Sequence, residues 1–131
     1  MSLQRNDKII LIEDDQKMLS LLTTLLGMEG YKPIPMRSPS PEIITATVEQ
    51  ERPAAVVLDV HLSDQNGIDL LRAVRSSMAE YNVHVLMTSG EDLRKECLAA
   101  GADGFLLKPY MPGELIDWLN EKSQPKQIEE S

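Results

Sequence analysis

Acidic, hydroxyl and basic side chains recur next to apolar runs in this sequence, and together they could carry phosphoryl chemistry. Glu13 and Asp14 follow one apolar run, Asp59 lies near the end of a second, and Thr88 and Lys108 follow two more. Carboxylates about 4 Å apart repel one another by about 4 kcal/mol per pair at an effective dielectric near 20. A hard cation such as Mg²⁺ would relieve that repulsion, a carboxylate can act as a nucleophile, and a lysine and a hydroxyl can stabilise phosphoryl oxygens.

The segments that carry these residues have the pattern of buried parallel strands. Residues 8–13, 54–60, 83–87 and 104–107 are short, mostly apolar runs that end at polar residues. Residues 31–36 are a weaker candidate, because two prolines remove amide hydrogens that a central strand would need. We therefore expect five strands, with 31–36 at the edge of the sheet.

Apolar residues at helical spacing separate the strands. The pattern predicts helices over residues 15–29, 41–51, 67–79, 91–100 and 112–122. Strands that alternate with helices through short connections predict an α/β domain whose parallel sheet is covered on both faces. Ligands of such sheets bind beyond the carboxyl ends of the strands, so the polar residues at those ends should meet in one site.

Length and composition limit the domain organisation and the classes of function. The chain has 131 residues, which fits one domain, and we assign residues 8–122 to it. Residues 1–7 are expected to be a tag remnant and N-terminal extension, and residues 123–131 a polar tail or the start of a linker.

Charge and hydropathy exclude several partners for this segment. A net charge of -8 argues against direct binding of nucleic acid, which needs clustered lysine and arginine. The longest apolar run has five residues, far below the roughly 20 of a membrane-spanning helix, so no membrane association is expected. The single cysteine, Cys97, has no partner for an internal disulfide, which favours a cytoplasmic location.

Four motifs, in this order along the chain, resemble those of the receiver domains of two-component response regulators. The resemblance is to the chemotaxis-regulator type of receiver domain. They read ILIEDD near the start, VVLDVHLSDQNG in the middle, and MTSG and FLLKP near the end, and the resemblance covers residues 8–122. It implies a doubly wound fold with five βα units, flavodoxin-like strand order 2-1-3-4-5 and helices on both faces of the sheet.

The resemblance also implies roles for individual residues. Asp59 would be the phosphoacceptor, and Mg²⁺ would be bound by Asp14, Asp59, the backbone carbonyl of His61 and, through water, Glu13. Lys108 would contact the phosphoryl oxygens.

Three further positions would take part in the switch. Thr88 is expected to supply the switch hydroxyl, with Ser89 as the alternative, because the loop that follows is shorter than is usual in the family. The bond between Lys108 and Pro109 is expected to be cis, and the ring of Phe105 is expected to turn inward on activation.

The implied function is a phosphoacceptor signalling domain that assists its own phosphorylation and dephosphorylation and is not an enzyme of another class. A sensor histidine kinase or a histidine phosphotransfer protein would donate the phosphoryl group. The face built from helix 91–100, strand 104–107 and helix 112–122 would then change its preference for partners. An output domain, a partner protein and a homodimer are all compatible with this function.

Two loop positions depart from the family pattern and leave alternatives open. Ser63 stands where the family usually has proline, and Asn66 where an acid or serine is common. An interaction module that no longer cycles phosphate is one alternative. An aspartyl-phosphate phosphatase would need an acid where the chain has His61, and a flavin-binding domain would need a phosphate-binding loop where the acids follow the first strand.

Other features have simpler structural explanations. The acids from Glu13 to Asp15 favour the N-terminus of the first helix. Gly67 and Gly101 are expected to adopt positive φ angles, and the side chain of His61 is expected to face solvent.

Overall fold

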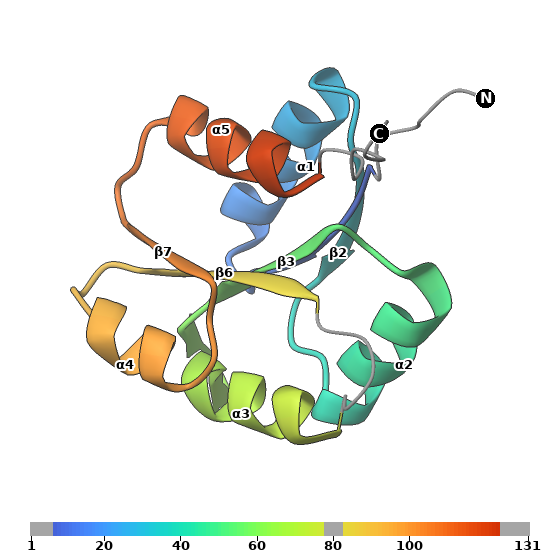
Figure 1. The fold of residues 1–131 in the computed structure, drawn as a ribbon. Coiled ribbons are helices and arrows are strands. Elements are labelled where there is room, and N and C mark those ends of the chain that lie inside the picture. The colour runs from blue at the N-terminus through green and yellow to red at the C-terminus, as the bar shows by residue number, and fades with distance from the viewer. Residues whose placement is uncertain (1–6, 78–82, 124–131) are drawn as a thin grey trace, which may run out of the picture.

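The computed structural model describes residues 7–77 and 83–123, in which five strands form one parallel sheet between two layers of helices (Figure 1). The order in the sheet is β2-β1-β3-β6-β7, which is the expected order 2-1-3-4-5 when only these five strands are counted. The strands are β1 (Lys8–Ile12), β2 (Lys32–Met36), β3 (Ala55–Asp59), β6 (His84–Ser89) and β7 (Gly104–Leu107). The helices are α1 (Gln16–Met28), α2 (Pro41–Glu51), α3 (Gly67–Ser77), α4 (Arg94–Ala99) and α5 (Pro112–Ser123).

Alternate side chains along each strand pack into two separate hydrophobic cores, one on each face of the sheet. Ile9 and Leu11 of β1 pack with α1 and α5 on one face, while Ile10 and Ile12 pack with α2, α3 and α4 on the other. All four side chains are at most 1% exposed, and burial of each contributes about 2 kcal/mol. β3 is buried along its whole length for the same reason.

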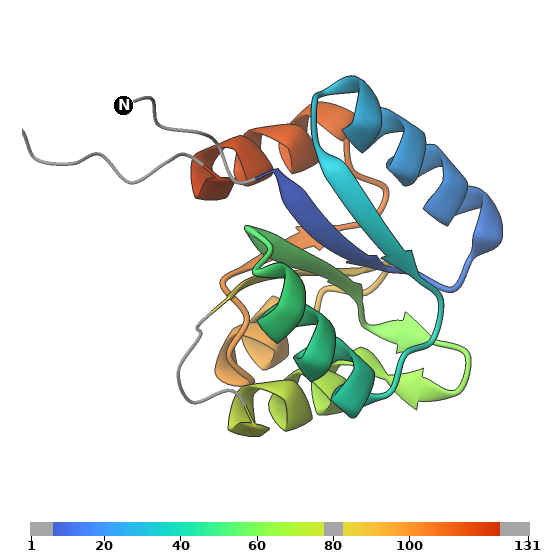
Figure 2. The same cartoon turned by 90° about the vertical axis from the view of Figure 1, so that its right-hand side faces the viewer.

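The edge position of β2 agrees with its sequence. Pro33 and Pro35 pair with Ile9 and Leu11 of β1, and β2 has no other neighbour among the described strands. Its free edge lies along the side of the sheet that faces the viewer in Figure 2. The nitrogens of Pro33 and Pro35 point to this free edge, so the missing amide hydrogens remove no hydrogen bond between β2 and β1.

Polar caps fix the starts of the first two helices. The Asp15 carboxylate accepts from the backbone amides of Lys17 at 3.0 Å and Met18 at 3.2 Å. Ser40 caps α2 through the amide of Ile43. Because Asp15 is engaged at the helix end, Glu13 and Asp14 are the acids that remain for the edge of the sheet.

A small hairpin after β3 is the one element of the described residues that was not predicted from the sequence. It consists of β4 (His61–Leu62) and β5 (Gln65–Asn66), which pair antiparallel. The hydroxyl of Ser38 donates to the Asp64 carboxylate, and the Gln65 amide donates to the Pro39 carbonyl at 2.7 Å. The hairpin is thereby tied to the loop after β2, beside which it lies in Figure 2.

Gly67 does not have the positive φ angle that was expected to explain the glycine at this position. Positive φ angles occur at Gly101, as expected, and at Gly30, but not at Gly67. A Cβ on Gly67 would instead lie 2.3 Å from the carbonyl oxygen of Asp59. Glycine is needed there because the start of α3 lies directly against the backbone of β3.

Element boundaries differ from the predictions mainly at the helix ends. α4 begins at Arg94, three residues later than expected, and α5 includes Ser123, one residue beyond its expected end. Residues 1–6, 78–82 and 124–131, which include most of the expected extension and tail and the end of the third predicted helix, lie outside the described residues. Of the helices described, none has the length and apolar character needed to cross a membrane.

Candidate functional site

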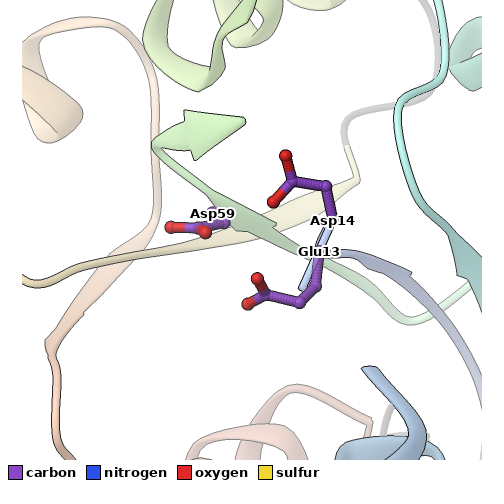
Figure 3. A group of neighbouring side chains, drawn as sticks. All are labelled: Glu13, Asp14 and Asp59. Carbon is purple, nitrogen blue, oxygen red and sulfur yellow. The ribbon is translucent and has the colours of Figure 1, made fainter. Parts of the chain in front are cut away.

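Three carboxylates converge at the carboxyl ends of β1 and β3. Glu13 and Asp14 directly follow β1, and Asp59 is the last residue of β3. One carboxylate oxygen from each lies within 4.8 Å of the other two, and Figure 3 shows the three groups turned toward a common space. The structure therefore brings together the acids that the sequence placed at two strand ends.

Lys108 joins the two buried acids. Its Nζ lies 3.1 Å from Glu13 Oε1 and 3.3 Å from Asp59 Oδ2. The side chains of Glu13 and Asp59 are 5% and 7% exposed, whereas that of Lys108 is 25% exposed. Lys108 follows β7 directly, and its bond to Pro109 is cis, as expected.

Burial and charge shift the ionisation of this buried group. Burial raises the pKa of Glu13, the negative charge of Asp59 raises it further, and Lys108 opposes both effects. Burial lowers the pKa of Lys108, but Asp59 and Glu13 together raise it more, so its net shift is upward. The ammonium group is thus held charged, and the excess of negative charge is carried by Glu13 and Asp59.

Asp14 has different surroundings, because it lies at the half-exposed rim of the site. The backbone amide and the hydroxyl of Ser63 both donate to its Oδ2. The hydroxyl bond is the main cause of a lowered pKa at Asp14. Ser63 lies between β4 and β5, so the unpredicted hairpin supplies the partner of this acid.

The two candidate switch hydroxyls have different environments. Thr88 pairs with Asp59 in the register of β3 and β6, which places both side chains on the same face of the sheet. Thr88 is 2% exposed. The Ser89 hydroxyl accepts a bond of 3.0 Å from the amide of Glu91 and so caps the following loop.

His61 contacts the site through its backbone. Its amide donates to Asp59 Oδ1 at 3.4 Å. Its side chain is 54% exposed, as expected, and its imidazole Nε2 lies 2.8 Å from the Glu91 carboxylate. The role expected for its carbonyl oxygen as a metal ligand stays a prediction.

Phe105 already lies inward in this structure. The residue is 4% exposed, and the guanidinium of Arg94 lies 5.5 Å from the centre of its ring. An Arg94 nitrogen also donates to the Phe105 carbonyl at 3.3 Å. The structure therefore shows the Phe105 ring in the inward position, which was expected only after activation.

The donor set fits a hard divalent cation. It consists of carboxylate oxygens, which are the ligands Mg²⁺ prefers, and one oxygen from each acid lies within 4.8 Å of the other two. Burial raises the pKa of Glu13 most, and the negative charge of Asp59 raises it further. A cation bound among Glu13, Asp14 and Asp59 would balance that negative charge.

Two residues beside the site had no role in the sequence-based prediction. Ser63 could be noticed only as a departure from the family pattern. Tyr110 is half-buried near the acids, and its burial, followed by the charges of Glu13 and Asp59, raises its pKa to about 12. No motif marked this tyrosine, because its position depends on how the chain turns after Pro109.

Comparison with known proteins identifies the family. Residues 9–120 match the response regulator receiver domain. Regulatory protein VanRc of Enterococcus gallinarum is 35% identical over 112 residues, covering 85% of this chain and 47% of that protein. The DNA-binding response regulator MtrA of Mycolicibacterium smegmatis is 32% identical, covering 83% of this chain and 47% of that protein. The chain thus spans about half the length of these relatives.

A solved structure supports the fold independently. The receiver domain of sensor histidine kinase PA1611 from Pseudomonas aeruginosa PAO1, solved with a magnesium ion coordinated in its active site cleft, has a TM-score of 0.74 and 23% sequence identity. The superposition covers 88% of this chain and 96% of that one. With the match over residues 9–120 and the acids at the strand ends, this chain belongs to the receiver domains of two-component response regulators.

Proposed function

We propose that Asp59 accepts a phosphoryl group in a reaction that depends on Mg²⁺ bound by Glu13, Asp14 and Asp59. Phosphoryl transfer to an aspartate is the general function of receiver domains, and the assignment to Asp59 rests on one observation. Its carboxylate is 7% exposed, yet it faces both Lys108 and two further acids at a strand end. A buried charge with that set of partners is costly to maintain without a chemical role.

The proposed step is a direct displacement. An Asp59 carboxylate oxygen attacks the phosphorus of a phosphohistidine, the phosphorus–nitrogen bond breaks, and the donor imidazole keeps the electron pair and takes up a proton. When bound, Mg²⁺ would neutralise charge on the carboxylates and the phosphoryl oxygens. Lys108, already 3.3 Å from Asp59, would donate to a phosphoryl oxygen.

Thr88 is the better candidate for the switch hydroxyl. Its register with Asp59 directs it to the same face of the sheet, whereas the Ser89 hydroxyl is engaged by the Glu91 amide. Phosphorylation changes the charge of Asp59 from one negative charge to about two. Attraction of Thr88 and Lys108 toward the new oxygens would move the β6–α4 loop and shift the population of states at the α4–β7–α5 face.

Phosphoryl incorporation tests the assignment. The chain should become labelled by a small-molecule phosphodonor, or bind beryllofluoride, only when Mg²⁺ is present, and Asp59→Asn should abolish both. Asp69→Asn, which alters an exposed acid on α3, is the matched control and should label normally. Mass spectrometry would locate the modified residue, and labelling that persists in Asp59→Asn would refute the assignment.

We further propose that a histidine kinase or histidine phosphotransfer protein is the donor and contacts the surface beside Lys108. An apolar cavity of about 460 Å³ adjoins this residue, between α1 and the segment after β7. It is lined by Met18, Leu21, Leu22, Leu25, Lys108, Pro109, Tyr110 and Pro112. A donor protein must approach Asp59 closely, and this surface offers it apolar contacts next to the site.

A charge placed on this surface would separate protein donors from small ones. Leu21 is 62% exposed, so Leu21→Glu should leave folding and labelling by a small-molecule donor unchanged while slowing transfer from a phosphorylated donor protein at least about tenfold. Leu98→Glu, on the surface of α4, is the matched control. Equal transfer rates in the two variants would show that the donor protein does not bind at this surface.

The surface change would act on an output domain or a separate partner. MtrA is described as DNA-binding and is about twice as long as the matched segment. We propose that phosphorylation of this chain controls an output domain or partner protein, which contacts the α4–β7–α5 face. The alternative of an interaction module that no longer cycles phosphate is disfavoured, because Glu13, Asp14 and Asp59 form one cluster and Lys108 pairs with two of them.

A further inference from the structure

The three acids of the site need partners even when no ion is bound. Among the described residues, Lys108 Nζ forms ion pairs with Glu13 and Asp59 and none with Asp14. Asp14 is instead contacted by Ser63, which donates both its amide hydrogen and its hydroxyl hydrogen. Two donors on a carboxylate stabilise its ionised form and fix its orientation.

Both Ser63 bonds end on the same oxygen of Asp14. They engage Oδ2 and leave the second oxygen of the carboxylate for another ligand. Figure 3 shows the Asp14 carboxylate with one oxygen directed toward the side of Asp59. A carboxylate that accepts from protein donors at one oxygen and lies in a cluster of three acids that could hold a cation has the arrangement of a metal ligand fixed by an outer partner.

The hairpin holds Ser63 in place. Ser63 lies in the connection between β4 and β5, and its neighbour Asp64 accepts from the Ser38 hydroxyl. Gln65 donates to the carbonyl of Pro39 on the far side of the turn. The two residues that follow Ser63 are therefore tied to the loop after β2, and Leu62, which precedes it, pairs with Gln65.

A serine at this position changes what the loop can offer. Proline, the usual residue of the family here, has neither an amide hydrogen nor a hydroxyl. Ser63 supplies two donors that proline would lack, and both are used on Asp14. The departure from the family pattern thus coincides with a specific contact to a residue of the proposed site.

We infer that Ser63 is a positioning residue of the metal site, which holds Asp14 in the orientation that binds Mg²⁺ before the ion arrives. The inference rests on the proposed function, since it concerns the same site. It adds a determinant of metal affinity at a position where the chain departs from the family pattern.

Magnesium affinity of the whole chain, measured by calorimetry without a phosphodonor, tests the inference. Ser63→Pro removes both donors and should weaken Mg²⁺ binding about tenfold, as loss of an outer partner of a metal ligand typically does. Ser63→Ala removes the hydroxyl alone and should weaken binding about threefold, and Ser63→Thr should restore it. Ser76→Ala, an exposed serine of α3, is the matched control and should bind as the original chain does. Unchanged or tighter binding in Ser63→Ala and Ser63→Pro would overturn the inference.

A second substitution shows whether Ser63 acts through Asp14. In the Asp14→Asn background, Ser63→Ala should cause no further loss of Mg²⁺ affinity, because the carboxylate it positions is gone. An additional threefold loss would mean that Ser63 acts by another route and would also overturn the inference. Thermal unfolding without metal checks that each variant folds, and Ser63→Ala decides the question if Ser63→Pro does not.

The two proposals fail in different experiments. If Asp59 is labelled and Mg²⁺ binds equally well with and without the Ser63 hydroxyl, the role of Ser63 fails and the phosphoacceptor stands. If Ser63 affects Mg²⁺ binding but Asp59 takes up no phosphoryl group, the proposed function fails and the positioning role stands. A chain that binds no Mg²⁺ overturns the role of Ser63 directly.

Discussion

The buried part of the acidic site and its exposed rim are held by different kinds of interaction. In the buried part, Glu13 and Asp59 share the ammonium group of Lys108, and all three side chains come from the ends of sheet strands. At the rim, Asp14 is bound by neutral donors of Ser63 in a short hairpin. Charge balance dominates the first region and hydrogen bonding the second.

The difference separates what the sheet positions from what a loop positions. The register of β1, β3 and β6 fixes Glu13, Asp59 and Thr88 as a consequence of burying the apolar strands. Leu62 anchors the hairpin in the core, whereas its turn, which carries Ser63, is tied to the loop after β2 by side-chain contacts and can change with less effect on the core. Chemistry common to the family can therefore stay with the strands, while metal affinity can be adjusted at the rim.

The largest effect should come from the backbone that carries the buried part. Gly67→Ala places a methyl group 2.3 Å from the Asp59 carbonyl, and the resulting displacement should lower the free energy of unfolding by about 3 kcal/mol. Gly27→Ala is the matched control, because its added Cβ meets no atom within 4 Å and alanine favours the helix. Urea denaturation would measure both. A Gly67→Ala variant as stable as the original chain would show that α3 does not press on β3.

The next effect concerns the lysine that balances the buried acids. Lys108→Met should lower the free energy of unfolding by about 2 kcal/mol at neutral pH, because two buried carboxylates lose their shared partner. The loss should shrink as pH falls, since protonation of Glu13 removes one of the charges. Denaturation at several pH values would show this dependence.

A surface ion pair provides the control for Lys108. Lys8 lies 3.0 Å from Glu51, but both side chains are about a third or more exposed, so Lys8→Met should cost less than about 1 kcal/mol. If the two methionine variants lost equal stability, burial would not distinguish the two regions.

The same contrast explains how far the sequence alone could predict the molecule. The uninterrupted apolar run of β3 and the prolines of β2 indicated a central and an edge strand, and both predictions are confirmed. Because parallel strands end at one edge of the sheet, the meeting of Glu13 and Asp59 followed from the strand pattern. The presence of Lys108 at the same edge followed in the same way.

The rim could not be predicted because it depends on contacts between loops. The strands β4 and β5 have two residues each, too few for a periodic pattern. Their position depends on Ser38 and Pro39, more than 20 residues earlier in the chain. The reason for glycine at position 67 was also not predicted, because the close approach between α3 and β3 cannot be recognised in the local sequence.

The smallest effect is on the ionisation of two adjacent residues in the metal-free chain. Burial and Asp59 raise the pKa of Glu13 above its ordinary value of 4.5, whereas the Ser63 hydroxyl lowers the pKa of Asp14 below its ordinary value of 3.8. The stabilising contribution of Asp14 is present above pH 3.8 and is lost as pH falls through its lower folded-state pKa. For Glu13 the sign is opposite: its contribution is present below pH 4.5 and is lost as pH rises through its higher folded-state pKa.

Carboxyl-carbon nuclear magnetic resonance would follow the two titrations separately. In Ser63→Ala, the pKa of Asp14 should move up toward 3.8, while Glu13 should titrate as before because its partners lie in the buried part. Shifts of both residues in the same direction would mean that the rim and the buried part respond as one electrostatic unit. Independent titration would instead show that two neighbouring acids of the proposed metal site are controlled by different interactions, one by the sheet and the other by the hairpin.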